Sequence, residues 1–177
     1  ILGANTNRWT HRGIANVPRI SSPYGDKVRA CFNAREGMDW VGWDATSLEA
    51  CIEAHYTFAY DGGAYAELLM DGDVHTANQK ALGLDTRAQA KTFKYAVTYG
   101  AQPATLSKTL GCSTKEAEVI YNEFWKGNPA LSALKKSLTK QWKLTGKKYI
   151  KGLDGRPIHT RSEHSLLNAL FQSAGAI

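Results

Sequence analysis

The sequence lacks the features that mark several common classes of protein. No apolar run approaches the roughly 18 residues that a membrane-spanning helix needs. The three cysteines, Cys31, Cys51 and Cys112, form no CxxC pair, and the histidines form no HExxH motif. Neither a disulfide framework nor a zinc site is therefore indicated. The chain carries no recognisable secretory signal or transit peptide, which favours a reducing, intracellular setting.

The composition is that of a folded globular chain with a basic balance. Of its 177 residues, 43% are hydrophobic and 21% are charged, and the formal net charge is +6. That length allows one domain or part of a larger one, and the positive charge favours polyanionic partners without naming one. The chain begins with Ile1 and ends at Ile177 inside an apolar helical pattern, so we expect an excerpt from a longer protein.

Hydrophobic periodicity and turn residues predict a mostly helical chain with a few short strands. Residues 1–38 are polar and rich in turn signals, and residues 39–43 read as a short buried strand. Helices are expected over 45–60, 64–70, 74–82, 87–99, 103–110, 114–126, 129–144 and from 162 to the C-terminus. Residues 147–152 and 157–160 are expected to form a hairpin around an Asp-Gly turn. The expected fold class is α+β, predominantly helical.

One helical stripe combines cations with aromatic rings. Arg87, Lys91, Tyr95 and Tyr99 are spaced four residues apart, and each step of four turns the direction by only about 40°. Two cations near the positive end of a helix dipole suit a triphosphate, and the rings beyond them suit a base or sugar. The alternative is an exposed basic face followed by two core tyrosines. Lys94 lies about 300° around the helix from Lys91, outside the stripe.

Two further groups of residues are candidates. Asp44 follows the expected strand, and a carboxylate in that position can bind Mg²⁺; the simpler alternative is that Asp44 is the N-cap of the next helix. Glu49 lies in that helix, and its alternative is an ordinary solvent-exposed position. His164, Asn168 and Gln172 are also four apart. Such neutral donors and acceptors suit the minor-groove edges of a duplex, and the alternative is an ordinary wet helix face.

Taken together, these segments resemble the family A DNA polymerases, most closely their replicative phage branch. Asp44-Ala-Thr-Ser-Leu-Glu49 resembles the family's motif A, and Arg87-x3-Lys91-x3-Tyr95-x3-Tyr99-Gly100 resembles its motif B. The resemblance implies helices of a fingers subdomain with part of an antiparallel-sheet palm. Residues 1–60 would belong to the palm and residues 61–161 to the fingers, and residues 162–177 would return to the palm before motif C.

The resemblance also implies a role for each candidate residue. Asp44, with the carbonyl of Ala45, would bind the catalytic Mg²⁺ ions, two in the complete polymerase. The implied nucleotide-binding residues are Arg87, Lys91, Tyr95, Tyr99, His75 and Glu49, with Lys91 also catalytic and Glu49 excluding a ribose 2′-hydroxyl. The implied DNA-binding residues are Arg8, His164, Asn168 and Gln172. The implied partners are dNTP, primer–template DNA and a processivity factor bound to the thumb. The resemblance implies no membrane association and a location in the cytoplasm, which for a viral protein is the cytoplasm of the host.

Two departures from the family pattern stand out. Motif A usually continues Glu-Leu-Arg, whereas this chain reads Glu49-Ala50-Cys51, and the chain ends before motif C with its second metal-binding Asp. We therefore expect the isolated chain not to extend a primer, because this chemistry uses two carboxylates. Two alternatives stay open at this point. One is a fragment of a single-subunit phage RNA polymerase, against which Glu49 argues, and the other is a non-catalytic nucleic-acid-binding remnant.

Overall fold

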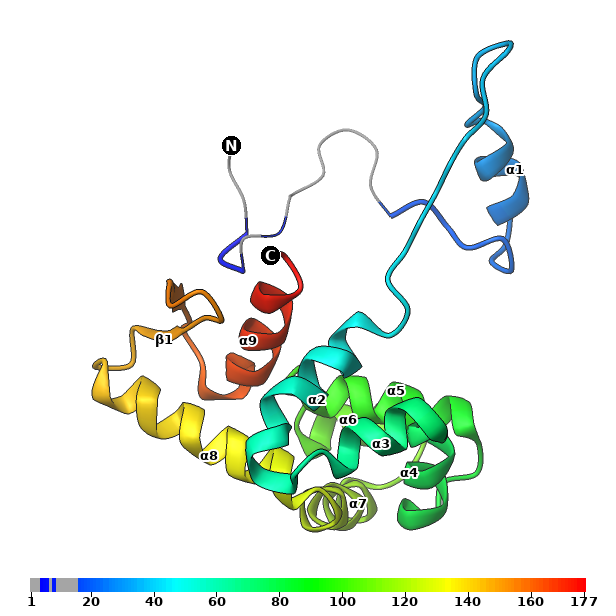
Figure 1. Cartoon of the computed structure of the whole chain (residues 1–177). Coiled ribbons are helices and arrows are strands. Elements are labelled where there is room, and N and C mark those ends of the chain that lie inside the picture. The colour runs from blue at the N-terminus through cyan, green and yellow to red at the C-terminus, as the bar shows by residue number, and fades with distance from the viewer. Residues whose placement is uncertain (1–3, 7, 9–15) are drawn as a thin grey trace. The chain divides into compact units, whose positions relative to one another are not determined.

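The computed structural model describes residues 4–6, 8 and 16–177, and it divides into two compact units (Figure 1). The smaller unit comprises residues 1–4 and 9–46, and its described part contains α1 (Gly25–Ala30). The larger unit comprises residues 5–8 and 47–177. Its elements are α2 (Leu48–Asp61), α3 (Ala64–Asp71), α4 (Val74–Leu82), α5 (Arg87–Thr98), α6 (Pro103–Leu110), α7 (Thr114–Gly127), α8 (Pro129–Leu144), β1 (Tyr149–Lys151), β2 (Pro157–His159), the 3-10 turn η1 (Glu163–Ser165) and α9 (Leu166–Ala174).

Local signals set the ends of most of these helices. Asp73 caps α4 by accepting hydrogen bonds from the amides of His75 and Thr76, at 3.0 and 3.2 Å. Thr86 and Ser113 each open a capping box, at the starts of α5 and α7. Glycines in the left-handed conformation end α2, α4 and α6. The predicted helices of the larger unit are therefore confirmed, most of them to within about two residues.

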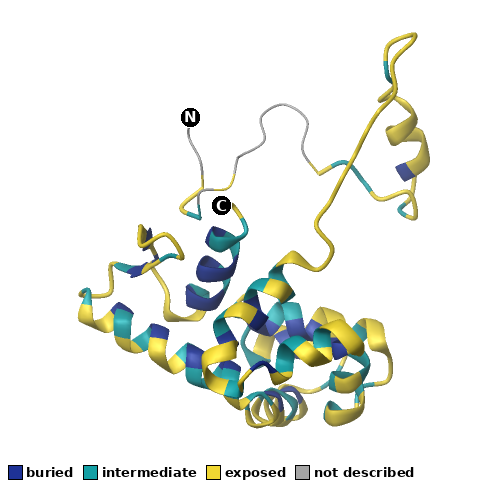
Figure 2. Ribbon diagram, in the orientation of Figure 1, coloured by how far each residue is buried: buried dark blue, intermediate teal, exposed yellow. Residues whose placement is uncertain are grey.

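The core of the larger unit lies between α5, α7, α8, α9 and the hairpin. Phe93 on α5 meets Phe124 on α7 edge to face, with ring centroids 5.7 Å apart, and both are fully buried. Leucines and an indole from α8 and α9 complete the cluster. Figure 2 shows α9 as the most continuously buried helix, which explains its apolar sequence. None of the described helices is long and apolar enough to cross a membrane.

The predicted hairpin is present and docks onto α8. Strand β1 pairs with β2 in antiparallel register, with Ile150 opposite Ile158, and both isoleucines are buried. Gly155 adopts φ +79° in the connecting turn, which favours glycine. The indole Nε1 of Trp142 donates to the carbonyl of Thr160 at 3.2 Å, and this bond ties the hairpin to α8.

The prediction of a buried strand over residues 39–43 is wrong. These residues have no strand structure, and Trp40, Val41 and Trp43 are 74%, 87% and 91% exposed. A strand needs a neighbour to receive its backbone hydrogen bonds, and among the described residues the only two strands pair with each other. The alternative role of Asp44 as a helix N-cap is also wrong, because α2 begins at Leu48 with Ser47 as its N-cap.

Candidate functional site

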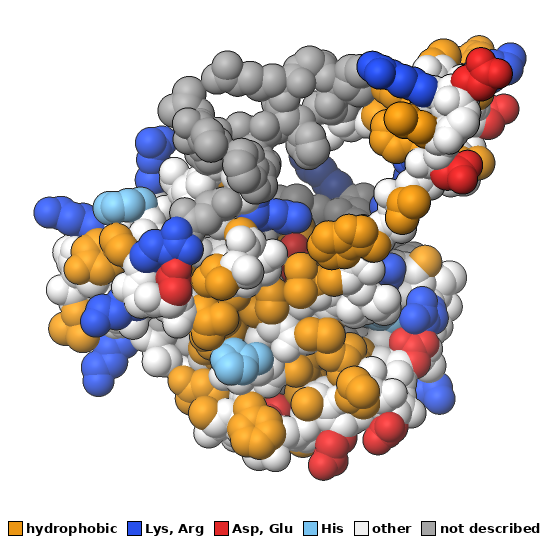
Figure 3. Space-filling view, turned by 45° about the horizontal axis from the view of Figure 1, so that its top comes forward, with side chains coloured by type: hydrophobic (Ala, Val, Ile, Leu, Met, Phe, Trp, Pro, Cys, Tyr) orange, Lys and Arg blue, Asp and Glu red, His pale blue; other side chains and the backbone are white. Residues whose placement is uncertain are grey.

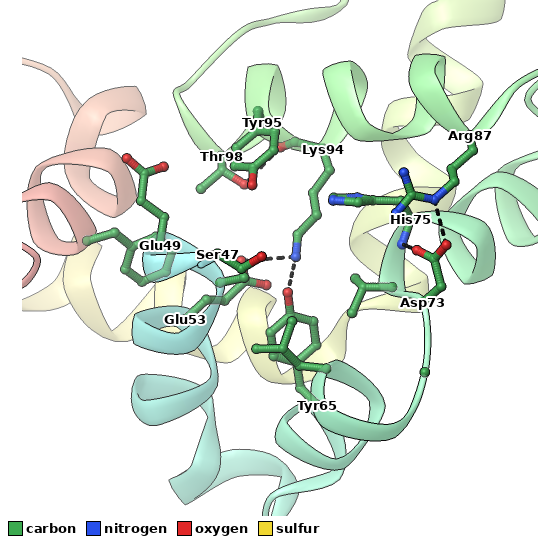
Figure 4. A pocket seen from close by; sticks show the side chains of 15 residues that line it. Ser47, Glu49, Glu53, Tyr65, Asp73, His75, Arg87, Lys94, Tyr95 and Thr98 are labelled. Atoms are coloured by element: carbon green, nitrogen blue, oxygen red, sulfur yellow. Dashed lines mark hydrogen bonds and ion pairs between the residues drawn. The ribbon is translucent and has the colours of Figure 1, made fainter. Parts of the chain in front are cut away.

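A cavity of about 350 Å³ opens in the larger unit between α2, α3, α4 and α5 (Figure 4). Its charged and aromatic lining residues are Glu49, Glu53, Tyr65, Asp73, His75, Arg87, Lys94, Tyr95 and Phe171. Four residues predicted to bind nucleotide therefore share one cavity: Glu49, His75, Arg87 and Tyr95. Lys91 and Tyr99, the other two, lie outside its lining and are both exposed.

One end of the cavity is cationic. Arg87, in the first turn of α5, places its Nε 2.5 Å from a carboxylate oxygen of Asp73, the cap of α4. This guanidinium holds the pKa of Asp73 well below its usual range, and the carboxylate raises the pKa of Arg87. Both side chains are well exposed, so the pair adds little to stability. Its effect is to fix the position of the guanidinium at the cavity.

His75 lies beside this cationic end with an unused ring nitrogen. Burial, and then the positive charges of Lys94, Arg87 and Lys91, lower its pKa. The imidazole is therefore neutral at pH 7, so each ring nitrogen can accept or donate one hydrogen bond according to the tautomer. Nδ1 is buried and has no hydrogen-bond partner among the described residues. A buried nitrogen of this kind is available to a ligand that enters the cavity.

At the other end of the cavity, Glu49 contacts two further residues with predicted roles, Tyr99 and Arg8. The hydroxyl of Tyr99 donates to Glu49 Oε2 at 2.6 Å, and Arg8 lies 3.9 Å from the other carboxylate oxygen. Burial and the Glu49 carboxylate raise the pKa of Tyr99 to about 12, and a hydrogen bond to Gln172 opposes this rise. The phenol therefore stays protonated and acts as a donor. Arg8, Glu49 and Tyr99, which are far apart in the sequence, therefore lie close together here.

Two further residues predicted to bind DNA, His164 and Asn168, lie in η1 and in the first turn of α9. His164 is exposed, and its Nδ1 is 3.2 Å from Nε2 of Gln102. The side-chain oxygen Oδ1 of Asn168 is buried and has no hydrogen-bond partner among the described residues. Gly100, with φ +94°, passes so close to His164 that a Cβ would lie 2.3 Å from its carbonyl oxygen. Only glycine allows the chain just after α5 to approach η1 in this way.

The structure also shows a cluster that the sequence analysis missed. Lys94, set apart from the predicted stripe, is 4% exposed and forms an ion pair with the buried Glu53, while Nζ also donates to the hydroxyl of Tyr65. The buried positions of α5 are Ala90, Phe93, Lys94, Val97 and Thr98. That spacing is the core face of an amphipathic helix, so a charge at position 94 was a readable signal of a buried partner.

The predicted metal ligands belong to the smaller unit. Asp44 is exposed, and the structure brings no group of three or more His, Cys, Asp or Glu residues together as a metal site within its described part. The donors themselves, a carboxylate and the backbone carbonyl of Ala45, are of the oxygen type that Mg²⁺ prefers. Asp44 and Ala45 therefore offer oxygen ligands of the type that suits Mg²⁺, including one carboxylate.

Exposed lysines follow α8 and the hairpin. They are Lys136, Lys140, Lys143, Lys147, Lys148 and Lys151. Figure 3 shows basic side chains gathered at the left of that view, where the hairpin end of the larger unit lies. This basic strip, as we call these six lysines, accounts for a good part of the positive net charge. Its charge suits a phosphate backbone.

The sequence and the fold have counterparts in a known family of proteins. A profile of DNA polymerase family A matches residues 4–176. The chain therefore belongs to DNA polymerase family A. This membership excludes the alternative of an RNA polymerase fragment.

Individual relatives agree with this assignment. The chain is 39% identical to the DNA-directed DNA polymerases of Escherichia phage T7 and Enterobacteria phage T3, matched over 99% of this chain and 28% of each relative. It is 25% identical to the thermostable DNA polymerase I of Thermus aquaticus, over 81% of this chain and 18% of the relative. The chain thus spans little more than a quarter of the phage relatives it matches.

A solved structure supports the fold. The POL domain of Pol1 from M. smegmatis, in complex with DNA primer-template and dNTP, matches with a TM-score of 0.72 over 91% of this chain and 31% of that chain. The two are 22% identical in sequence, so this similarity bears on the fold alone. The expected α+β, predominantly helical fold is confirmed.

Proposed function

We propose that this chain forms the dNTP- and primer–template-binding core of a template-directed DNA polymerase. One observation carries the proposal. A single cavity along α5 has Arg87 and His75, residues of the type that binds phosphate, at one end and Glu49 at the other. Tyr95 lies between the two ends, with its ring centroid 6.0 Å from that of His75. In this proposal residues 1–60 belong to the palm, residues 61–161 form the fingers, and residues 162–177 return to the palm.

The polarity of the cavity orients the nucleotide. The triphosphate would lie at the N-terminus of α5, where Arg87, Lys91 and the helix dipole favour negative charge. The unpartnered Nδ1 of His75 would donate to a phosphate oxygen in the tautomer that carries its proton there. The sugar would then lie between Tyr95 and Glu49, and Tyr99 would lie at the templating position. The Glu49–Tyr99 hydrogen bond supports this placement, since it holds the carboxylate at that end.

The reaction would be attack of a primer 3′-hydroxyl on the α-phosphate of the bound dNTP, with pyrophosphate leaving. Lys91 would neutralise the charge that shifts onto the phosphates in the transition state. Asp44 and the carbonyl of Ala45 would hold Mg²⁺, which when bound supplies further positive charge to the phosphates. The primer–template would be held by Arg8, His164, Asn168 and Gln172, and the lysines of the basic strip would meet the phosphate backbone.

Primer extension tests this proposal directly. A polymerase carrying this chain is incubated with Mg²⁺ and four primer–templates that differ only in the first templating base. Each template should select its complementary dNTP, and the added nucleotide should be read from denaturing gels. Binding of the primer–template without extension would instead support the non-catalytic remnant, and extension that ignores the template base would contradict the proposal.

Sugar selection gives a sharper prediction. Replacing Glu49 by Ala should raise the ratio of rNTP to dNTP incorporation efficiency, kcat/KM, by on the order of tenfold or more, because the side chain that excludes the 2′-hydroxyl is gone. Glu49→Gln is the matched control, since it keeps nearly the same volume and should keep most of the selection. If both variants select sugars as the unmodified protein does, Glu49 does not contact the sugar.

A further inference from the structure

A buried ion pair lies in the wall of the proposed nucleotide cavity. Nζ of Lys94 is 3.3 Å from Glu53 Oε2, and the two side chains are 5% and 4% exposed. Lys94 also donates to the hydroxyl of Tyr65 and lies 4.4 Å from the centre of its ring. Figure 4 shows the amine of Lys94 between its two partners, with a dashed line to each. We call Lys94, Glu53 and Tyr65 the buried triad.

Stability is a poor explanation for this arrangement. Burial raises the pKa of Glu53 and lowers that of Lys94, while the opposite charge of each partner counteracts both shifts. A buried pair of this kind often contributes no more stability than apolar residues of the same volume, although losing one partner is strongly destabilising. What the pair offers beyond apolar packing is a directional contact that is satisfied in one arrangement of its helices.

The triad connects the parts of α2 and α5 that carry Glu49 and Tyr95, the two residues proposed to enclose the sugar. Glu53 follows Glu49 by one turn of α2, Lys94 immediately precedes Tyr95 on α5, and Tyr65 adds α3. Both Glu49 and Tyr95 line the same cavity as the triad. A contact between positions 53 and 94 therefore constrains the separation of Glu49 and Tyr95, because each pair of neighbours shares one rigid helix.

We propose that Lys94, Glu53 and Tyr65 are positioning residues that set the spacing between Glu49 and Tyr95, and through it the selection of a deoxyribose over a ribose. This inference rests on the proposed function, since it concerns the sugar end of the same cavity. The triad touches no reacting atom in this proposal. It acts by holding the two walls that exclude the 2′-hydroxyl.

The test replaces the ion pair by apolar residues of similar volume. The double variant Glu53→Leu/Lys94→Met leaves no unpaired charge, so it should recover the stability lost in Lys94→Met alone, as measured by denaturant midpoint. Its ratio of rNTP to dNTP kcat/KM should nevertheless rise about tenfold, because the directional contact is lost. Tyr65→Phe keeps the ring and removes the hydroxyl, so it should raise the same ratio by a smaller factor.

A matched control is available on α7. Glu123 and Lys126 form an exposed ion pair one turn apart, outside the cavity. Glu123→Leu/Lys126→Met is chemically the same exchange and should leave the sugar ratio unchanged. Unchanged selection in both the buried double variant and Tyr65→Phe would overturn the inference. So would a double variant less stable than Lys94→Met, because the triad would then serve packing alone.

The outcomes also separate this inference from the proposed function. If the unmodified polymerase does not copy a template, the proposed function fails. If it copies a template and Glu49→Ala relaxes sugar selection while the triad variants do not, only the positioning role fails.

Discussion

Replacing Lys91 by Ala should lower the kcat of the polymerase by on the order of 10² or more, which corresponds to about 2.7 kcal/mol of transition-state stabilisation. Lys91 lies one turn after Arg87 on α5 and is exposed, with its charge free to meet a phosphate. A cation that meets charge developing in the transition state affects kcat more than KM. Single-turnover incorporation of one dNTP measures this effect without a contribution from product release.

The control for this prediction has to be chosen from the structure. Lys94 is unsuitable, because its removal leaves Glu53 buried and unpaired. Lys80 on the neighbouring helix α4 is exposed and lies outside the cavity lining. Lys80→Ala should therefore change kcat little. Equal small effects at positions 91 and 80 would mean that the stripe on α5 is only a solvated basic face.

Gly100→Ala should destabilise the folded chain by roughly 3 kcal/mol or more, since it combines a clash with an unfavourable backbone conformation. The added Cβ would lie 2.3 Å from the carbonyl oxygen and 2.9 Å from the carbonyl carbon of His164, at φ +94°. Backbone atoms cannot move aside as the end of a side chain can. The segment that follows α5 would have to separate from η1, and the contact between Gln102 and His164 would be lost with it.

Gly111→Ala is the matched comparison for Gly100→Ala. Gly111 also has a left-handed backbone, with φ +70°, but its Cβ would meet nothing within 4 Å. Its substitution should cost only about 1 kcal/mol, the conformational term alone. Denaturant unfolding of the two variants isolates the cost of the close approach. Similar losses at both positions would show that Gly100 does not approach the backbone of His164 closely.

The helices could be predicted because their ends are specified locally. Asp73, Thr86 and Ser113 accept hydrogen bonds from amides within three residues, so the sequence nearby contains the whole signal. The strand expected at residues 39–43 failed for the opposite reason. A strand depends on a partner elsewhere in the chain, and apolar residues such as Trp40 and Trp43 do not reveal whether a partner is there.

Only some of the residues that line the cavity could be predicted from the sequence, and their contacts could not. Spacing placed Arg87 and Tyr95 on one face of α5, and both line the cavity. The hydrogen bond from Tyr99 to Glu49 joins residues 50 positions apart, and helical periodicity carries no information about such a meeting. The buried position of Lys94 was missed because the stripe was considered without the opposite, buried face of α5. Whether Asp44 holds metal stays a prediction.

The carboxylate of Asp73 interacts with the first turns of both α4 and α5. Its carboxylate accepts the amide hydrogens of His75 and Thr76 at the head of α4 and also receives Nε of Arg87 at the head of α5. A guanidinium has five N–H donors, and this contact takes the one on Nε. The long side chain of Arg87 is therefore already ordered in the free protein, so less rotamer freedom would be lost when it binds a phosphate. In the proposed function, an incoming triphosphate would meet an arginine already paired with the carboxylate of Asp73, and it would share or replace that anion rather than neutralise an unpaired cation.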